Sequence, residues 1–480
     1  MGRDVLETGA FVDGFLVREK LHVGGMASLW RVTRDDIDFP IILKTPLILD
    51  GDDATAIVGF EMEQMILPHL TGPHAPRCVA VGDFSRQPYI VMEYVQGVSL
   101  LPEFETAPLS VERVRDIGAR VATALDALHR QHVIHLDIKP SNIILRTTGE
   151  AALIDFGLSR HEQLPDLLAE EFRLPMGTGP YISPEQVRGD RSDPRSDLFS
   201  LGVLMYHLAT GERPFGFPHS RRALRRRLWR DPIPPRAIRP EIPEWLQEII
   251  LRCLEVDPGK RHPTAAQLAF DLTHPDDVRI TERGRRMERD SLLTAWKRRW
   301  KTPFGHVAPA AQIAEQISAA PIVAVCVDLE ASVALTTTLR DTVSRILQAM
   351  PGARLACLNI LRLNRIGINY ALDSDGHNIH VNRLVELKEW ARPLDRHDIR
   401  ATFHVLEAAD VAGALVDYAR ANRVDQLVIG ARGSSSVRRF LGSVSSRVVA
   451  EAPCTVTVVR APAQAGQGDG TEELASAEQP

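Results

Sequence analysis

The pattern of apolar residues changes along the chain, and that change limits the folds that the sequence can adopt. In residues 11–272, short β-rich runs come first and mainly helical sequence follows from Val111 onward. The β-rich runs include residues 27–32, 40–44 and 88–94. Short runs of β-branched and aromatic residues are typical of strands, so this order predicts a small β lobe followed by a larger α lobe.

A different pattern occupies residues 321–459. The apolar runs IVAVCV, RLACLNIL, QLVIGA and TVTVV alternate with helical stretches such as residues 411–422. Such alternation is typical of βαβ units, whose strands lie in parallel. Because 480 residues exceed what one hydrophobic core usually serves, the length predicts two or three domains. The second pattern indicates an α/β domain that is independent of the first.

The segments between and after these regions differ from both. Basic residues dominate residues 283–301, where Leu292, Trp296 and Trp300 recur every four positions on one helical face. We therefore expect a basic amphipathic linker over residues 276–317. Either its apolar stripe packs on a domain and its charges are solvated, or it docks on a membrane surface or a partner. Residues 462–480 lack an apolar face, which predicts a disordered tail.

The charge balance excludes one class of partner. Lys and Arg total 57 against 62 Asp and Glu, so the formal net charge is −5 and the whole chain has no general attraction to nucleic acid. The N-terminus lacks the apolar core of a signal peptide, and no stretch reaches the roughly 18 apolar residues of a spanning helix. We expect a cytoplasmic protein without a transmembrane segment.

The segment HLDIKPSN at residues 135–142 precedes the tripeptide DFG at residues 155–157. This arrangement resembles the eukaryotic-type Ser/Thr protein kinases, and the similarity covers residues 11–275. The resemblance implies a bilobal α+β kinase fold in which Asp137 is the catalytic base and Lys139 neutralises the transferring phosphate. It also implies that Asn142 and Asp155 bind Mg²⁺ or Mn²⁺, for which oxygen donors are suited.

The resemblance extends upstream to the residues expected to bind ATP. Lys44 fits the strand lysine that holds the phosphates, and Glu63 is its expected ion-pair partner. We choose Glu63 over Glu61 because Phe60, Leu67 and Leu70 then fall at helix-face spacing around it. The hinge that binds adenine through backbone groups is expected at Met92, Glu93 and Val95.

The glycine-rich loop departs from the family pattern. It is expected to contact ATP through Val23, Gly24 and Gly25, but His22 and Ala27 replace the first and third of the usual glycines. A Cβ at those positions hinders close approach of the backbone to phosphate, so we expect ATP binding to be weaker than is usual in the family.

Downstream residues also match the family in order. Ser183-Pro184-Glu185 stands at the usual Ala-Pro-Glu position, and Arg261 is the expected partner of Glu185. Asp197 is expected to brace the backbone of the catalytic loop. Thr178 matches the threonine that lies beside the catalytic Asp and Lys, which favours Ser/Thr over Tyr substrates.

The segment that regulates many kinases is unusual here. Leu136 replaces an arginine that meets an activation-loop phosphate, and residues 160–177 contain no Ser, Thr or Tyr. Acidic residues occur there instead, at Glu162, Asp166, Glu170 and Glu171. We therefore predict activity that does not require phosphorylation of this segment.

A strongly basic helical region follows the motifs of the α lobe. Its arginines are Arg221, Arg222, Arg225, Arg226, Arg227 and Arg230. They form either a solvated helical face or a docking site for an acidic protein substrate or for the acidic tail of the chain.

In the second region, the strand QLVIG leads into Gly430 and Gly433, and Gly442-Ser443 follows after eight further residues. This arrangement resembles the universal stress protein family over residues 318–461, with an α/β Rossmann-like fold and a parallel sheet. The family motif G-x2-G-x9-G-[ST] is one residue shorter here. The resemblance implies that these residues and Asp328 bind a second ATP; the alternative is a purely structural turn. The resemblance also implies that two copies pair through the last strand, residues 455–459, so a homodimer is expected.

Together these features predict an ATP-dependent kinase that transfers the γ-phosphate to Ser/Thr hydroxyls of proteins, itself included, with a C-terminal domain that senses nucleotide or stress. The alternative is a weakly active or inactive ATP-binding scaffold that presents a dimerising stress domain. The altered glycine loop and Leu136 motivate that alternative.

Overall fold

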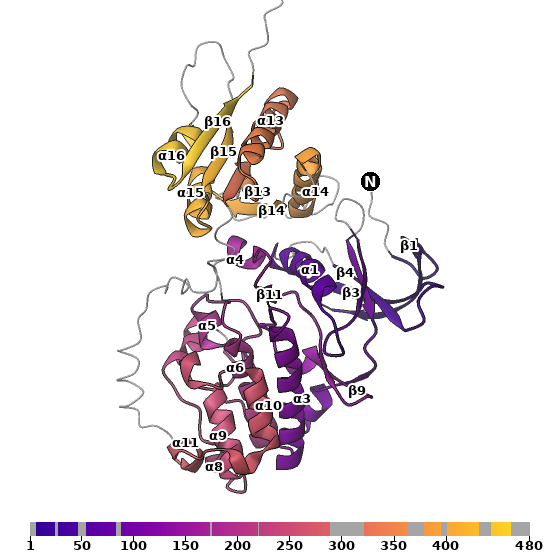
Figure 1. The fold of residues 1–480 in the computed structure, drawn as a ribbon, viewed down its shortest axis with the longest axis vertical. Helices are drawn as coiled ribbons and strands as arrows, with labels where there is room; N and C mark the ends of the chain where they lie inside the picture. Colours follow the sequence, from indigo (N-terminus) through magenta and orange to yellow (C-terminus); the bar gives the residue numbers. More distant parts are fainter. Residues whose placement is uncertain are drawn as a thin grey trace, which may run out of the picture. The chain divides into compact units, whose positions relative to one another are not determined.

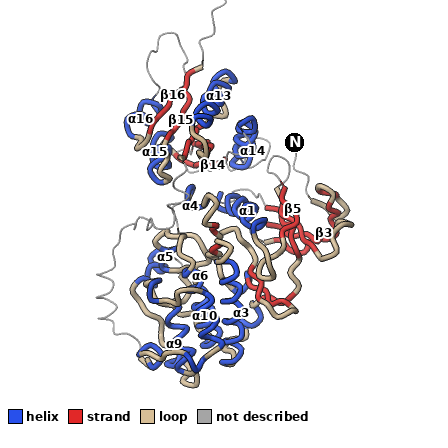
Figure 2. The backbone as a smooth tube through the Cα atoms, in the orientation of Figure 1, coloured by secondary structure: helices blue, strands red, loops and turns tan. Residues whose placement is uncertain are grey.

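The computed structural model describes most of the chain in two compact units. The described residues are 6–24, 27–46, 54–82, 88–172, 175–218, 220–288, 321–362, 379–394, 401–431 and 443–461. One unit comprises residues 1–319 with residues 367–385, and the other comprises residues 320–366 with residues 386–480 (Figure 1). Within each unit, the elements follow the two patterns expected from the sequence (Figure 2).

The first unit begins with a six-stranded antiparallel sheet in the order β1-β2-β3-β4-β6-β5. Its strands are β1 (Phe11–Val12), β2 (Phe15–Val23), β3 (Ala27–Thr33), β4 (Ile41–Pro46), β5 (Cys78–Gly82) and β6 (Tyr89–Glu93), and the helix α1 (Ala54–Ile66) follows β4. Alternate residues of β3 and β4 are buried, and Trp30 and Leu43 pack with Phe15 in the core of this lobe. This confirms the predicted β lobe.

The larger lobe is mainly helical. Its helices are α2 (Leu101–Glu105), α3 (Val111–His129), α4 (Leu167–Glu171), α5 (Pro184–Val187), α6 (Arg195–Thr210), α7 (Arg221–Leu224), α8 (Pro235–Ile238), α9 (Glu244–Cys253), α10 (Ala265–Thr273) and α11 (Glu282–Arg285). The helix α6 packs against α3 and α9, and nearly all of its residues are buried. A helix that is apolar on every side belongs in the centre of a domain, so α6 forms the core of this lobe.

Short strands also lie between these helices and hold the loops that connect them. They are β7 (Gly97–Ser99), β8 (Val133–Ile134), β9 (Ile143–Arg146), β10 (Ala151–Leu153) and β11 (Arg160–His161). Strands β7, β9 and β10 form one antiparallel sheet, and β8 pairs with β11. The segment 135–142 therefore connects strands of two different sheets, which fixes both of its ends.

The start of the expected linker packs on the helical lobe. The buried carboxylate of Glu248 in α9 accepts hydrogen bonds from the N–H groups of Thr281 (3.0 Å) and Gly284 (2.8 Å) and pairs with Arg283 (2.7 Å). The packed part of the first unit thus continues past residue 275. Residues 289–317, with the apolar stripe, lie outside the described part, as does the expected tail at 462–480.

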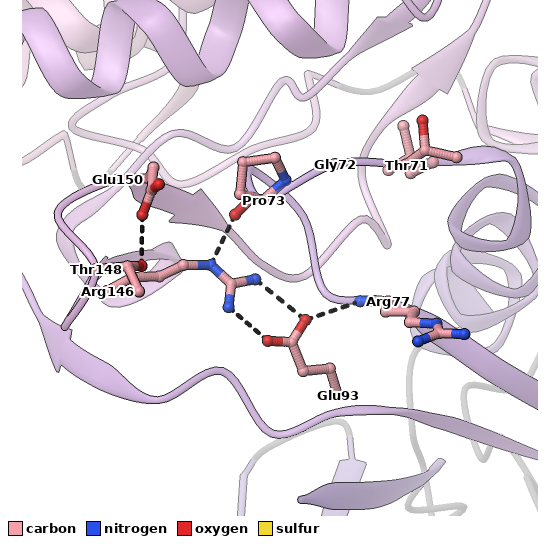
Figure 3. Close-up of a pocket in the computed structure, with 9 residues that line it drawn as sticks. Thr71, Gly72, Pro73, Arg77, Glu93, Arg146, Thr148 and Glu150 are labelled. Atoms are coloured by element: carbon pink, nitrogen blue, oxygen red, sulfur yellow. Dashed lines mark hydrogen bonds and ion pairs between the residues drawn. The ribbon is translucent and has the colours of Figure 1, made fainter. Parts of the chain in front are cut away.

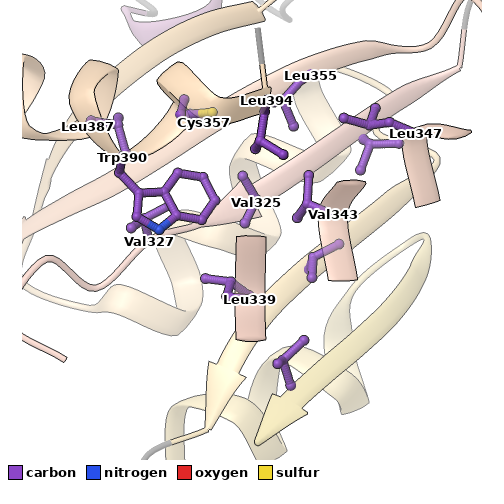
Figure 4. Close-up of a cluster of buried hydrophobic side chains, with 14 of the residues drawn as sticks. Val325, Val327, Leu339, Val343, Leu347, Leu355, Cys357, Leu387, Trp390 and Leu394 are labelled. Atoms are coloured by element: carbon purple, nitrogen blue, oxygen red, sulfur yellow. The ribbon is translucent and has the colours of Figure 1, made fainter. Parts of the chain in front are cut away.

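The second unit is a parallel five-stranded sheet in the order β14-β13-β12-β15-β16. Its elements are β12 (Ile322–Cys326), α13 (Val333–Ala349), β13 (Arg354–Arg362), residues 386–391 of α14 (Ile379–Ala391), β14 (Ala401–Ala408), α15 (Val411–Ala421), β15 (Gln426–Ala431), α16 (Ser443–Glu451) and β16 (Thr455–Arg460). Leu339 and Val343 of α13 and Trp390 of α14 cover one face (Figure 4), and α15 and α16 cover the other. The predicted α/β fold with a parallel sheet is confirmed.

Candidate active site

The backbone of the loop at residues 135–142 is held by a buried carboxylate. Asp197, at the start of α6, accepts hydrogen bonds from the N–H groups of His135 (2.9 Å) and Leu136 (2.8 Å) and contacts His129 Nε2 (2.9 Å). Leu136 has φ 61°, a left-handed conformation that is unfavourable for leucine. Its side chain is buried, and its carbonyl accepts from Gln186 Nε2 (2.8 Å). Asp197 therefore braces the loop as predicted.

This bracing places Asp137 at the centre of a small polar cluster. Its Oδ2 accepts from Lys139 Nζ (2.6 Å) and Asn142 Nδ2 (3.1 Å), and its Oδ1 accepts from the hydroxyl (2.7 Å) and N–H (3.1 Å) of Thr178. Lys139 Nζ also contacts Thr178 Oγ1 (3.2 Å). The structure thus brings together Asp137, Lys139, Asn142 and Thr178, and donors fix the orientation of the carboxylate.

A second cluster links the β lobe to Asp155, the first residue of the DFG tripeptide. Lys44 Nζ in β4 lies 2.5 Å from Glu63 Oε2 in α1 and 3.0 Å from Asp155 Oδ1. The ion pair uses Glu63 rather than Glu61, as predicted from the helix face. The Glu63 side chain is 2% exposed, whereas that of Asp155 is 45% exposed, so Asp155 is the carboxylate that a ligand can reach.

The opposite charges of Lys44 and the two carboxylates shift one another's pKa values. Burial lowers the pKa of Lys44, but the charges of Asp155 and Glu63 outweigh burial, and the net change is upward. The charge of Lys44 lowers the pKa of Asp155 to about 2 against the effect of burial, and Lys139 adds to this lowering. Burial raises the pKa of Glu63, although Lys44 opposes this. Asp155 is therefore ionised at neutral pH and feels the lysines of both clusters.

Asn142 and Asp155 present suitable donors for a divalent cation. The backbone carbonyl of Asn142 accepts from Ile154 N–H (2.9 Å), which holds Asn142 beside the residue that precedes Asp155. The amide nitrogen of Asn142 donates to Asp137, so the amide oxygen, which accepts from Ser141 Oγ (3.3 Å), is the atom that can coordinate a metal. An amide oxygen and an ionised carboxylate fit Mg²⁺, which completes its shell with water and phosphate oxygens.

The expected hinge has backbone groups available for a ligand. The N–H of Glu93 donates to Arg77 O (2.9 Å) and that of Tyr94 to Pro40 O (2.8 Å). Val95 is 6% exposed, and among the described residues no hydrogen bond uses its N–H. An N–H without an acceptor among the described residues is free to donate to a ligand that accepts a hydrogen bond. Met92, at the end of β6, is also buried.

The side chain of Glu93 has a different role from its backbone. Its carboxylate pairs with the guanidinium of Arg146 in β9 and accepts from Arg77 N–H (3.2 Å) (Figure 3). Arg146 Nε also donates to Pro73 O (2.7 Å). These groups line a pocket of about 520 Å³. The ion pair joins β6 of the small lobe to β9 of the large lobe.

The glycine loop connects β2 to β3. Gly24 N–H donates to Ala27 O (2.9 Å), and a Cβ added at Gly24 would lie 3.5 Å from that oxygen, an ordinary contact. The fold of the protein therefore does not itself demand glycine at this position. Val23 is half exposed, and Gly25 lies outside the described residues.

Ion pairs within the protein hold parts of the segment at residues 160–177, where acidic residues replace Ser, Thr and Tyr. The buried side chain of Arg191 pairs with Asp166 (2.9 Å) and donates to the carbonyls of Leu158 (3.0 Å) and Ser159 (3.4 Å), directly after the DFG tripeptide. Glu162 contacts His132 Nδ1 (3.0 Å). Arg191 was not predicted from the sequence, because it lies outside every motif that the resemblance identifies.

The basic region contains one correction to the sequence analysis. Arg227 was expected on a solvated or docking face with the other arginines, but its side chain is 1% exposed. It donates to the carbonyls of Gly179 (2.8 Å) and Ile182, directly after Thr178. Glu185 pairs with Arg261 through two hydrogen bonds (2.7 and 3.0 Å), as predicted.

Three of the expected nucleotide residues of the second unit, Asp328, Gly430 and Ser443, lie in its described part. Asp328 follows β12, and Gly430 lies in β15, which is paired with β12. Ser443 is the first residue of α16, whereas Gly433 and Gly442 lie outside the described part. A Cβ at Gly430 would lie 3.3 Å from Leu335 Cδ2 of α13, so close helix packing accounts for that glycine.

Comparisons with known proteins agree with this geometry. The family model described as "Protein kinase domain" matches residues 19–271, and that of the "Universal stress protein family" matches residues 308–460. The serine/threonine-protein kinase PknB of Mycobacterium tuberculosis is 35% identical over 212 residues, which cover 43% of this chain and 34% of PknB. A probable serine/threonine-protein kinase of Clostridium perfringens, CPE1738, is 34% identical over 250 residues, with coverages of 52% and 36%.

A third relative is matched over more of its length. The serine/threonine-protein kinase PknL of Mycobacterium tuberculosis is 31% identical over 271 residues, which cover 56% of this chain and 67% of PknL. The chain spans only about a third of the length of PknB and CPE1738. Because the kinase model covers more than half of the chain, this chain belongs to the protein kinase family, and its C-terminal unit carries a universal stress protein domain.

Proposed function

We propose that this chain is a serine/threonine protein kinase that transfers the γ-phosphate of ATP to protein hydroxyls. The observation that carries the proposal is the position of Asp155, which lies 3.0 Å from Lys44 and directly follows Ile154, whose N–H donates to the carbonyl of Asn142 (2.9 Å). Asp155 therefore connects the cluster suited to holding a nucleotide with the cluster suited to orienting a hydroxyl. Phosphoryl transfer depends mainly on positioning and on charge neutralisation, which these groups supply.

In the proposed reaction, the hydroxyl oxygen of the substrate forms a bond to the γ-phosphorus. The bond from the γ-phosphorus to its bridging oxygen breaks, and the electron pair leaves with ADP. Asp137 accepts the hydroxyl proton, Lys139 stabilises the charge on the transferring group, and Lys44 holds the nucleotide phosphates. Asn142 and Asp155 would hold Mg²⁺, which neutralises phosphate charge when bound.

One experiment separates this proposal from the scaffold alternative and also tests independence from phosphorylation. The purified chain is incubated with γ-labelled ATP and a basic protein substrate, before and after phosphatase treatment. We expect incorporation in both samples, within about twofold, because Arg191 and His132 already hold the segment that a phosphate orders in other kinases. No incorporation in the untreated sample would favour a scaffold. Loss only after treatment would show that a phosphate is required.

We further propose that the second unit binds a purine nucleotide. The feature that supports this proposal is the change in strand order at β12, which pairs with β13 on one side and with β15 on the other. In open parallel sheets, ligands bind at the carboxyl ends of the strands at such a point, and Asp328 and Ser443 lie at that end. The pairing of two copies through β16, an edge strand of the described sheet, stays a prediction.

Calorimetry of the full chain with a non-hydrolysable ATP analogue tests this second site. We expect two binding events, one of which Asp328→Ala weakens by at least about tenfold because a polar partner of the nucleotide is lost. Asp417→Ala, an exposed position on α15, is the control and should leave both events unchanged. A single event that Asp328→Ala does not alter would contradict the site.

A further inference from the structure

The segment formed by α7 and the following 3₁₀ turn (Arg225–Leu228) lies against the residues that follow Thr178. The contact is made by Arg227, whose guanidinium donates to the carbonyls of Gly179, Pro180 (3.5 Å) and Ile182. Its Nε donates to Leu224 O (3.2 Å), and it lies over the ring of Phe215. Arg227 therefore fixes this segment beside the end of the hydroxyl-orienting cluster.

Arg227 is a buried cation that bonds only carbonyl groups in the described part of the chain. Burial lowers its pKa to about 10. Burying a charge without a counter-charge is costly, and the bonds to carbonyls offset part of that cost. These bonds hold residues 179–182 and the segment of residues 221–228 in a fixed position relative to each other.

Three neighbours of Arg227 differ from it in being exposed to solvent. Arg222, Arg225 and Arg226 are exposed. No described acidic side chain pairs with any of them, although other arginines of this unit, such as Arg146 and Arg191, have carboxylate partners. Like charges this close on one short helix repel one another, so the cluster is more favourable when an anionic partner is present.

We infer that Arg222, Arg225 and Arg226 select protein substrates whose accepting Ser or Thr is flanked by acidic residues. This inference rests on the proposed kinase function. Thr178 bonds to Asp137 and Arg227 bonds to Gly179, so the exposed arginines beside Arg227 lie in the segment that packs next to the residues flanking the hydroxyl-orienting cluster. The carboxylates of such a substrate supply the counter-charge that the described part of the protein lacks.

The test uses three peptides with one serine and otherwise identical neutral sequence. One carries three Glu before the serine, one carries three Glu after it, and one carries Gln at all of these positions. We expect kcat/KM to be about tenfold higher for one Glu peptide than for the Gln peptide, since each exposed pair contributes modestly. Raising the salt concentration should reduce that ratio because exposed charges are screened.

Variants of the full chain assign the preference to these arginines. Arg225→Gln with Arg226→Gln should remove most of the preference and leave only the share of Arg222, and Arg225→Glu with Arg226→Glu should favour a peptide with Lys in place of Glu. Arg279→Gln with Arg285→Gln removes the same charge from exposed positions elsewhere in the unit and should keep the ratio. Equal kcat/KM for all three peptides with the unaltered enzyme overturns the inference. Phosphorylation of none of them, with the basic protein also unlabelled, would instead reject the kinase function.

Discussion

Replacing Asp137 by Asn is expected to lower kcat about 100- to 10,000-fold, the usual contribution of a positioned general base. An amide has the shape of the carboxylate and can still accept from Thr178, but it cannot take the hydroxyl proton. It also loses the charge that pairs with Lys139 at 2.6 Å. The measurement is initial-rate transfer of γ-labelled phosphate at saturating ATP.

Binding of the nucleotide provides the internal control for this variant. Asp137 makes no hydrogen bond to the cluster of Lys44, Glu63 and Asp155 in the structure, so the Kd for a non-hydrolysable ATP analogue should change little. Asp276→Asn, at an exposed position, removes the same charge and should retain full turnover. An Asp137→Asn enzyme within threefold of the normal kcat would remove the carboxylate from the mechanism.

The groups that carry the proposed chemistry could be predicted from sequence because they occur in short motifs. Asp137, Lys139 and Asn142 lie within six residues, and a single buried acceptor, Asp197, fixes the backbone of the two residues that precede Asp137. Glu63 could be chosen over Glu61 because a helix has only one face toward the sheet. In each case the local periodicity and the chemistry lead to the same residue.

The contacts that fix the lobes and segments could not be predicted in this way. Arg146 and Glu93 are 53 positions apart, and nothing local in the sequence pairs them. The partners of Arg227 are carbonyl groups, which every residue has, so its burial leaves no trace in sequence. Strand β14 was missed because Thr402 and His404 look like surface residues. Both are buried, and His404 Nε2 lies 3.0 Å from Thr402 Oγ1.

The largest effect on stability is expected for Arg261→Ala. The side chain of Arg261 is fully buried, and that of Glu185 is 5% exposed. Beyond this pair, Arg261 donates to the carbonyls of Arg195 (2.8 Å) and Glu255 (2.8 Å). Its removal leaves a buried carboxylate with Ser196 Oγ (3.1 Å) as its remaining side-chain partner in the described residues. Leaving one charge of a buried pair unpaired costs about 3 to 5 kcal/mol of unfolding free energy.

Hydrogen–deuterium exchange under increasing urea measures this loss unit by unit, because a chain with two units does not unfold in one step. Peptides from α6 should lose protection at lower urea in Arg261→Ala, whereas peptides from β15 should not change. Arg130→Ala breaks a pair in which the arginine is 74% exposed, and it should cost no more than about 1 kcal/mol. Replacing both partners, as Glu185→Gln with Arg261→Met, should be less damaging than Arg261→Ala, since no buried charge is left unpaired. If the double variant were the less stable of the two, the fixed geometry of the ion pair, rather than the cost of an unpaired charge, would be what maintains this part of the large lobe.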